Sequence, residues 1–180
     1  MDLLQRARLE SYIYNASSAT RITGRECLGV IVFKGCNTVN VLFKKGQGLR
    51  PRFMSKDIFK QHFAEYRKQA GRFVKVEYSP LTGIFHAQSA RNMHKVYQVE
   101  LFPEKVTCNC GDWKKQEELG ISTPMCKHAY AALDLIGCSS LKDYVERDGF
   151  RFLDHSQYIG EDEDKRAYYE ERYTEEHYLW

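Results

Sequence analysis

The chain has 180 residues, a formal net charge of +3 and 43% hydrophobic residues, which is enough for one domain or two small modules with a sizeable core. No apolar run approaches the roughly 18 residues of a membrane span, and the first residues lack the basic and then apolar order of a secretory signal. We therefore expect an intracellular protein, cytoplasmic or nuclear, in which reduced, clustered cysteines indicate a metal site rather than disulfides.

The charges are distributed unevenly along the chain. Residues 161–180 contain eight acidic and three basic residues, so this segment carries −5 and the other 160 residues carry +8. Residues 44–76 alone contain ten Lys or Arg and two acids. A basic body with an acidic tail is typical of a nucleic-acid binder whose tail masks the basic surface. A solvated basic face and a disordered end would give the same composition.

The first predicted elements are a helix and a hairpin. Residues 1–14 have the apolar spacing of a short amphipathic helix. Residues 27–33 and 38–43 are rich in β-branched side chains and enclose a Gly/Asn turn, which predicts two antiparallel strands.

A loop and a longer helix are predicted next. Residues 44–52 are rich in glycine and basic residues, which is typical of a loop. Ser55 as N-cap, Asp57 in the first turn and Gly71 as a stop predict a helix between them.

In the second half of the chain, apolar and polar residues first alternate with a period of two, and the composition then becomes typical of helices. Four segments are predicted as strands, namely 73–78, 84–89, 97–102 and 106–110. Two are predicted as helices, namely 127–136, which Gly137 ends, and the short 141–146.

Four residues have the types and spacing of a metal site: Cys108, Cys110, Cys126 and His128. On a strand, residues i and i+2 project from the same face, so the first two can hold one ion from a hairpin edge. The last two stand at the entry to a predicted helix, where free N–H groups favour a thiolate. This pattern predicts a tetrahedral Cys₃His zinc site. The alternative is four unrelated residues, with the cysteines as small buried side chains.

We interpret the predicted zinc as structural. Four good ligands leave no open coordination position, which a catalytic zinc usually keeps. The sequence has no His-x-Glu or His-Glu-x-x-His motif that would supply a general base. We therefore expect no enzymatic activity, and we expect the metal to stabilise a small finger that buries too little to hold itself.

These residues also resemble a known family, the SWIM-type zinc finger. The similar stretches read Cys108-Asn-Cys110-Gly-Asp-Trp and Pro124-Met-Cys126-Lys-His128-Ala-Tyr-Ala-Ala-Leu. The family pattern is C-x-C, a variable spacer and C-x-H, often with a proline before the third ligand and a lysine between the last two. The resemblance covers about residues 97–136, less than a quarter of the chain. It implies zinc bound by the four residues and a role in DNA binding or protein–protein contact.

The basic residues of the loop, the first long helix and the finger are candidates for phosphate contacts. They are Lys44, Lys45, Arg50, Arg52, Lys56, Lys60, Arg67, Lys68, Lys114, Lys115 and Lys127. Contacts of this kind tolerate any base sequence and weaken with salt. For Trp113, covering the metal shell is the favoured interpretation over stacking on a base.

Together these patterns predict an α+β protein with antiparallel hairpins, a few helices and a ββα-like zinc finger. We divide it into an α+β region with the basic loop and helix (1–95), the SWIM-like finger with its following helix (96–150) and an acidic aromatic tail (151–180). The sequence leaves open whether residues 1–95 form a separate domain or one continuous sheet with the finger. The leading hypothesis is a non-enzymatic, zinc-containing accessory protein that binds DNA mostly through phosphates. The alternative is a protein–protein adaptor whose finger and tail dock a partner.

Overall fold

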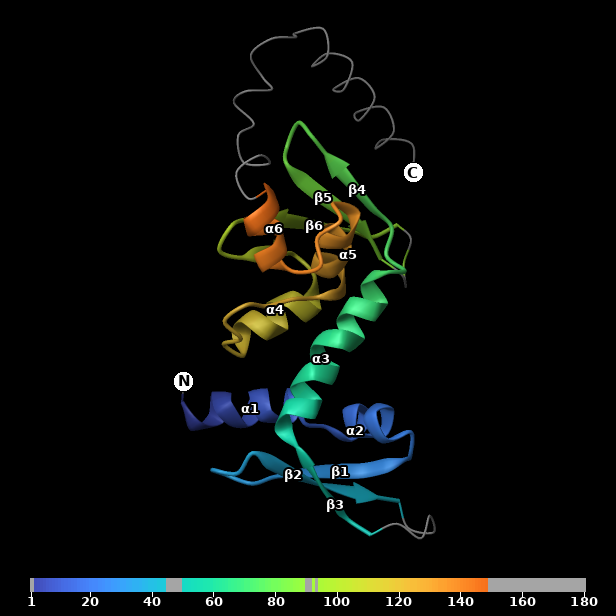
Figure 1. Ribbon diagram of the computed structural model, residues 1–180, viewed down its shortest axis with the longest axis vertical. Coiled ribbons are helices and arrows are strands. Elements are labelled where there is room, and N and C mark those ends of the chain that lie inside the picture. The colour runs from blue at the N-terminus through green and yellow to red at the C-terminus, as the bar shows by residue number, and fades with distance from the viewer. Residues whose placement is uncertain (1, 45–49, 90–91, 93, 149–180) are drawn as a thin grey trace, which may run out of the picture. The chain divides into compact units, whose positions relative to one another are not determined.

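A computed structural model of the chain describes residues 2–44, 50–89, 92 and 94–148. These residues form helices and two antiparallel sheets, of three and four strands, which confirms the α+β class (Figure 1). They divide into two compact units. The first comprises residues 2–67 and 116–122, and the second comprises 68–115 and 123–148. The predicted tail 151–180 and Lys45 lie outside the described residues.

The first unit contains a three-stranded sheet in the order β1-β2-β3. Its elements are α1 (Leu3–Ile13), α2 (Ala16–Thr23), β1 (Cys27–Val32), β2 (Thr38–Phe43), β3 (Arg52–Ser55) and most of α3 (Lys56–Gly71). The hairpin and α3 are confirmed. Helix α2 and strand β3 were not predicted, and α2 owes its ends to the Asn15 side chain, which accepts from Ser18 N at 2.9 Å, and to Gly24 at φ 69°.

One face of this sheet forms the core of the first unit. Val39 and Val41 of β2 are fully buried and pack in one cluster with Ala19 of α2 and Phe59 of α3. Helices therefore cover the face on which these valines lie. Since side chains alternate along a strand, the residues between the valines belong to the opposite face.

The second unit contains a four-stranded sheet in the order β4-β5-β6-β7. Its elements are β4 (Val76–Ser79), β5 (Ile84–Gln88), β6 (Val96–Leu101), β7 (Val106–Cys108), α5 (Lys127–Leu135), α6 (Leu141–Asp148) and the start of α4 (Gly111–Glu118). Helix α5 contacts all four strands (Figure 1). The predicted strands and the two later helices are confirmed, whereas α4 was not predicted.

The division between the units differs from the boundary predicted at residue 95. Strand β5 pairs with β6 in a regular antiparallel register, with Phe85 opposite Val99 and Ala87 opposite Tyr97. A boundary at residue 95 would separate these partners. The four strands before and after that point form one sheet, so the finger shares its core with residues 74–89.

Helix α3 begins as its capping residues indicate. The Ser55 hydroxyl accepts from Asp57 N at 3.1 Å, and Asp57 lies in the first turn, where a negative charge is favourable. No helix among the described residues is long and apolar enough to cross a membrane.

Candidate metal centre

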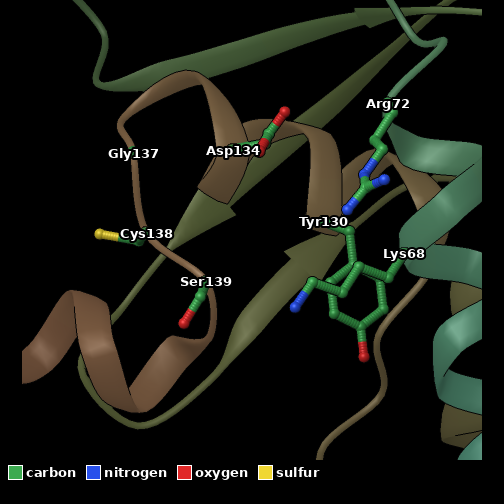
Figure 2. Close-up of a pocket in the computed structure, with 7 residues that line it drawn as sticks. All are labelled: Lys68, Arg72, Tyr130, Asp134, Gly137, Cys138 and Ser139. Carbon is green, nitrogen blue, oxygen red and sulfur yellow. The ribbon is translucent and has the colours of Figure 1, made fainter.

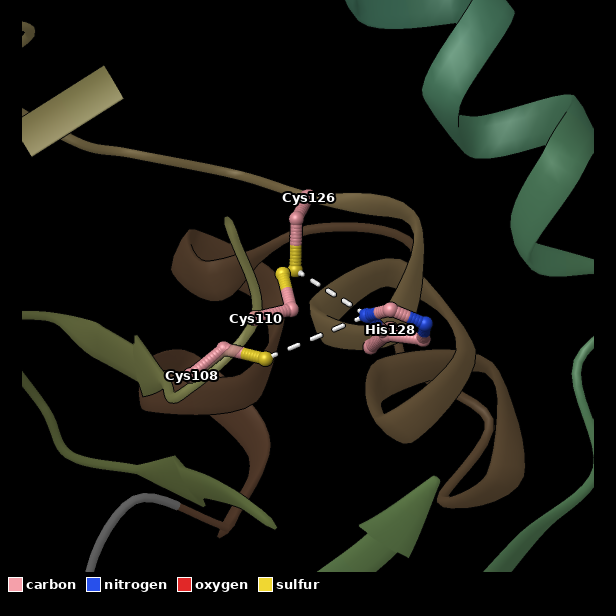
Figure 3. Close-up of side chains that lie close together, drawn as sticks. All are labelled: Cys108, Cys110, Cys126 and His128. Atoms are coloured by element: carbon pink, nitrogen blue, oxygen red, sulfur yellow. Dashed lines mark hydrogen bonds between the residues drawn. The ribbon is translucent and has the colours of Figure 1, made fainter. Parts of the chain in front are cut away.

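Four potential ligands meet at one point in the second unit. The donor atoms of Cys108, Cys110, Cys126 and His128 all lie within 4.8 Å of one another, and all four side chains are buried. His128 turns Nδ1 toward the sulfurs, at 4.0 Å from Cys108 Sγ and 3.9 Å from Cys126 Sγ (Figure 3). The arrangement predicted from the spacing is therefore present.

The first two ligands are not positioned by one strand face, as the sequence predicted. Cys108 is the last residue of β7, but Cys110 lies beyond the strand and immediately precedes α4. Its Sγ accepts from Trp113 N at 3.4 Å, and its carbonyl accepts from Lys114 N. Cys110 thus begins a helix instead of sharing a strand face with Cys108.

The second pair lies at the helix start that the sequence predicts. Cys126 is the N-cap of α5, with Sγ accepting from Ala129 N at 3.4 Å, and His128 lies in the first turn. Two of the three cysteine sulfurs therefore face helix N-termini, where N–H donors and the dipole stabilise negative charge.

Aromatic side chains enclose the ligands. Trp113 is buried in the same core cluster as the cysteines, and its Nε1 donates to the carbonyl of Val106 at 3.0 Å. The Tyr97 ring packs on His128, with 4.5 Å between ring centroids. The structure thus agrees with the interpretation of Trp113 as a cover, and Tyr97 is a neighbour that spacing alone did not reveal.

The three thiols influence each other's ionisation strongly. Hydrogen bonds from the Cys108 and Cys126 thiols hold the pKa of Cys110 far below its usual value. Donating to Cys110 raises the pKa of Cys108 to about 12, and hydrogen bonds to Cys108 and Cys110 together with burial raise the pKa of Cys126. The close packing of three thiols therefore opposes the ionisation of all three together, and a bound cation would favour it.

This donor set fits a zinc ion. Tetrahedral zinc, with bonds of about 2.3 Å to sulfur and 2.0 Å to nitrogen, places its donors about 3.5–3.8 Å apart. The donors here need only a small contraction to reach that spacing. Three sulfurs and an imidazole suit zinc better than they suit calcium or magnesium, which prefer oxygen.

Contacts other than the metal ligands hold helix α5 in place at both of its ends. A Cβ added to Gly71, at the end of α3, would lie 2.8 Å from the carbonyl oxygen of Lys127 and 3.2 Å from Ala131 N, so only glycine permits this close approach. At the other end, Arg147 of α6 donates to the carbonyls of Ile136 and Gly137. The ligand-bearing helix is therefore held in a defined position.

Two of the predicted phosphate contacts are engaged within the fold of the first unit. Lys56 is buried and forms an ion pair with Glu10 at 3.7 Å. Arg67 lies over the Phe63 ring, 3.6 Å from its centroid, and donates to Tyr12 Oη.

Other candidates are exposed, and some of them have acidic partners. Lys44 pairs with Glu26 at 3.0 Å and Lys60 with Asp57 at 3.2 Å. Five candidates are exposed or half-buried and form no ion pair with another described residue. They are Arg50, Arg52, Lys68, Lys114 and Lys127. Lys115 is exposed on α4.

A pocket of about 290 Å³ lies beside α5 in the second unit. Figure 2 shows Lys68, Arg72 and Tyr130 on one side of it and Cys138 and Ser139 on the other. Its full lining is Lys68, Arg72, Tyr130, Asp134, Gly137, Cys138 and Ser139. Lys68 and Arg72 bring positive charge to this pocket and Asp134 brings negative charge, so its lining has mixed charge.

Comparison with known proteins agrees with this geometry. Residues 97–137 match the family model of the SWIM zinc finger, which contains all four ligands. The resemblance expected from the sequence is thus confirmed for this part of the chain. Searches among curated proteins and among solved structures gave no significant match.

Proposed function

We propose that the chain is a non-enzymatic DNA-binding protein whose finger carries one structural zinc ion. The observation that carries the zinc assignment is the meeting of four buried donor atoms from β7, the start of α4 and the start of α5. A four-ligand set leaves no position for substrate or water, which supports a structural role. Three reduced thiols in one site also support an intracellular location.

The zinc would add a direct link between segments that also pack in one core cluster. Cys108 and Cys126 are separated by 17 residues and lie at the ends of different elements. With the ion bound, all three sulfurs are thiolates that face a cation, so the binding free energy becomes folding free energy. The zinc content is tested by elemental analysis, with one ion per chain expected. Replacement by Co²⁺ should give the visible absorption of a tetrahedral thiolate site.

The DNA-binding proposal rests on the charge distribution. The first 160 residues carry +8, and several cations are exposed without a recorded acidic partner among the described residues. Lys114 lies in the first half of α4, and Lys127 lies between two ligands at the start of α5. These positions support phosphate contacts from the finger, which would not select a base sequence.

A salt titration tests this proposal. Affinity for a labelled duplex is measured by fluorescence anisotropy across salt for the zinc-loaded chain and for the variant Lys114→Gln/Lys127→Gln. We expect affinity to fall linearly on a log–log scale and the slope to decrease by about two in the variant, one for each lost phosphate contact. The control Lys60→Gln removes a cation that already pairs with Asp57 and should change the slope much less.

A zinc-loaded chain that does not bind duplex DNA at low salt would contradict the DNA part of the proposal and favour the adaptor alternative. The same measurement on a chain without residues 161–180, which carry −5, tests masking by the tail. Masking requires that removal of the tail increases both the affinity and its dependence on salt.

A further inference from the structure

The sheet of the first unit has a second face that no described element covers. We define the outer face as Ile31, Phe33, Asn40, Leu42 and Phe53. Phe33 follows β1, and the other four lie in the three strands, where they alternate with the core residues. Phe53 is 65% exposed, Ile31 44% and Phe33 37%. Single exposed apolar residues are ordinary, but a contiguous patch of them marks a binding surface.

Aromatic rings lie on both sides of the central strand β2. The rings of Phe33 and Phe53 have centroids 6.1 Å apart and an interplanar angle of 38°. Every nucleobase has a flat face that stacks on such rings, and sheets with exposed aromatic side chains bind single strands in this way. Each ring therefore offers a place for one base.

A polar side chain lies between these places. Asn40 stands opposite Ile31 on one neighbouring strand and opposite Phe53 on the other. Its Oδ1 is buried and has no hydrogen-bond partner in the described structure. Buried carbonyl oxygens are nearly always paired, so this oxygen can accept from an N–H group of a base that enters the face, such as the N3–H of thymine.

The charges around the outer face favour an anionic ligand. Residues 25–55 contain six Lys or Arg and one acid, Glu26, which is already paired with Lys44. Arg52 is exposed and precedes Phe53 in β3, but it stands opposite Val41 and so belongs to the edge of the other face. An apolar surface for a protein partner does not require this excess of positive charge, whereas a polyanion with flat bases matches both properties.

We propose that the outer face binds single-stranded DNA, with bases stacked on Phe33 and Phe53 and phosphates near the basic residues of the segment 25–55. This inference rests on the proposed function in taking DNA as the ligand. It assigns the contact to the first unit, and it does not involve the zinc finger.

The test compares oligo-dT with duplex DNA. Affinity for a labelled single-stranded oligo-dT is measured by anisotropy with the zinc-loaded full chain, the variant Phe53→Ala and the variant Phe53→Trp. The matched control is Phe73→Ala, which removes the same side chain from an 85% exposed position in the second unit. We expect Phe53→Ala to weaken oligo-dT binding about tenfold, equivalent to about 1.4 kcal/mol, with an unchanged salt slope, because it removes stacking and no phosphate contact.

Phe53→Trp should retain or increase the affinity, and Phe73→Ala should leave it unchanged. Duplex binding should change less than twofold in all these variants, since paired bases cannot reach the rings. The inference is overturned if the chain does not bind oligo-dT, if Phe53→Ala and Phe73→Ala behave alike, or if oligo-rU binds tenfold more tightly than oligo-dT. It is also overturned if sedimentation shows a dimer that Phe53→Ala dissociates without changing oligo-dT binding, because the face then joins two copies.

The two proposals can fail separately. If Lys114→Gln/Lys127→Gln lost duplex binding but bound oligo-dT normally, the phosphate contacts of the finger and the stacking on the outer face would both be supported as separate contacts. A chain that binds oligo-dT through Phe53 but does not bind duplex would retain this inference and contradict the phosphate contacts of the finger.

Discussion

Replacement of Gly71 by alanine tests how closely α3 approaches the metal-binding helix. The new Cβ would lie 2.8 Å from the carbonyl oxygen of Lys127, a residue located between the ligands Cys126 and His128. It would also lie 3.2 Å from Ala131 N. Since both contacts are with backbone atoms of α5, the conflict can be relieved only if a helix shifts.

Two effects of opposite sign determine the magnitude. Alanine is favoured over glycine inside a helix by about 1 kcal/mol, and by less at its last residue. Overpacking a well-packed contact costs about 1–3 kcal/mol. We therefore expect Gly71→Ala to lower the free energy of unfolding by about 1–2 kcal/mol. A displaced start of α5 should also weaken zinc binding, because it carries two ligands.

The assay requires a signal from the second unit alone. The chain has two tryptophans, so in a Trp180→Phe background the fluorescence of buried Trp113 reports on the finger core. Urea unfolding followed by this signal gives the change in stability, and competition with a chromogenic chelator gives the change in zinc affinity. The control is Gly111→Ala, whose Cβ would meet nothing within 4 Å although the residue adjoins Cys110.

The two variants should change the free energy of unfolding in different directions. Gly111→Ala should be neutral or slightly stabilising, since it only improves helix propensity at the start of α4. If Gly71→Ala were as stable as the original chain and bound zinc equally well, the close approach of α3 to α5 would be wrong. Equal losses in both variants would show that any substitution near the ligands is harmful.

Three further predictions concern the metal and the two units. Cys126→Ser should lose zinc and the folded finger, although serine can still cap α5, whereas exposed Cys36→Ser should retain both. Because the pKa values of Cys108 and Cys126 are raised and that of Cys110 is lowered, zinc binding should release two protons, and affinity should fall about 100-fold for each unit by which the pH is lowered. Phe59→Ala should destabilise the first unit by about 3–5 kcal/mol without changing zinc affinity, because Phe59 lies in the other core.

Each of these has a decisive readout. Elemental analysis and circular dichroism follow Cys126→Ser, and retention of one zinc per chain would contradict its role as a ligand. Calorimetry in buffers of different ionisation enthalpy counts the released protons, and a count of three would show that Cys110 is an ordinary thiol. A large decrease in zinc affinity in Phe59→Ala would show that the two cores are coupled.

The metal site was predictable because spacing and residue type determine it locally. Cysteine and histidine pairs at the ends of predicted elements are unusual, and few other arrangements explain them. The route of the first pair was not predictable. Residues 111–118 contain Gly111 and several charged residues and show little helical periodicity, so the helix that Cys110 begins became apparent only from the backbone.

The division of the chain was harder to predict because it depends on long-range pairing. The extent of the SWIM resemblance placed a boundary at residue 95, yet β5 and β6 on either side of it pair directly. Similarly, β3 contains only four residues, so its pairing with β2 has no clear local signal. Short strands of this kind obtain their stability from the sheet to which they add.

The predicted phosphate contacts show a further limit. Charge on a helix does not distinguish a cation exposed to solvent from one engaged within the fold. Lys56 and Arg67 are spaced like surface residues, but a carboxylate of α1 holds the first and aromatic rings hold the second. Two of these partners, Glu10 of Lys56 and Tyr12 of Arg67, lie more than 40 residues away in the chain, so only the fold identifies them.

The two fixed ends of α5 restrict how this unit can recognise anything else. Exposed helix N-termini commonly attract phosphates, but the N–H groups at the start of α5 already face the sulfur and carbonyl of Cys126. The carbonyls after its last turn are occupied by Arg147. A helix engaged at both poles cannot present its dipole to a ligand, so a partner of this unit must be recognised by side chains that project laterally, such as Lys127 at its start.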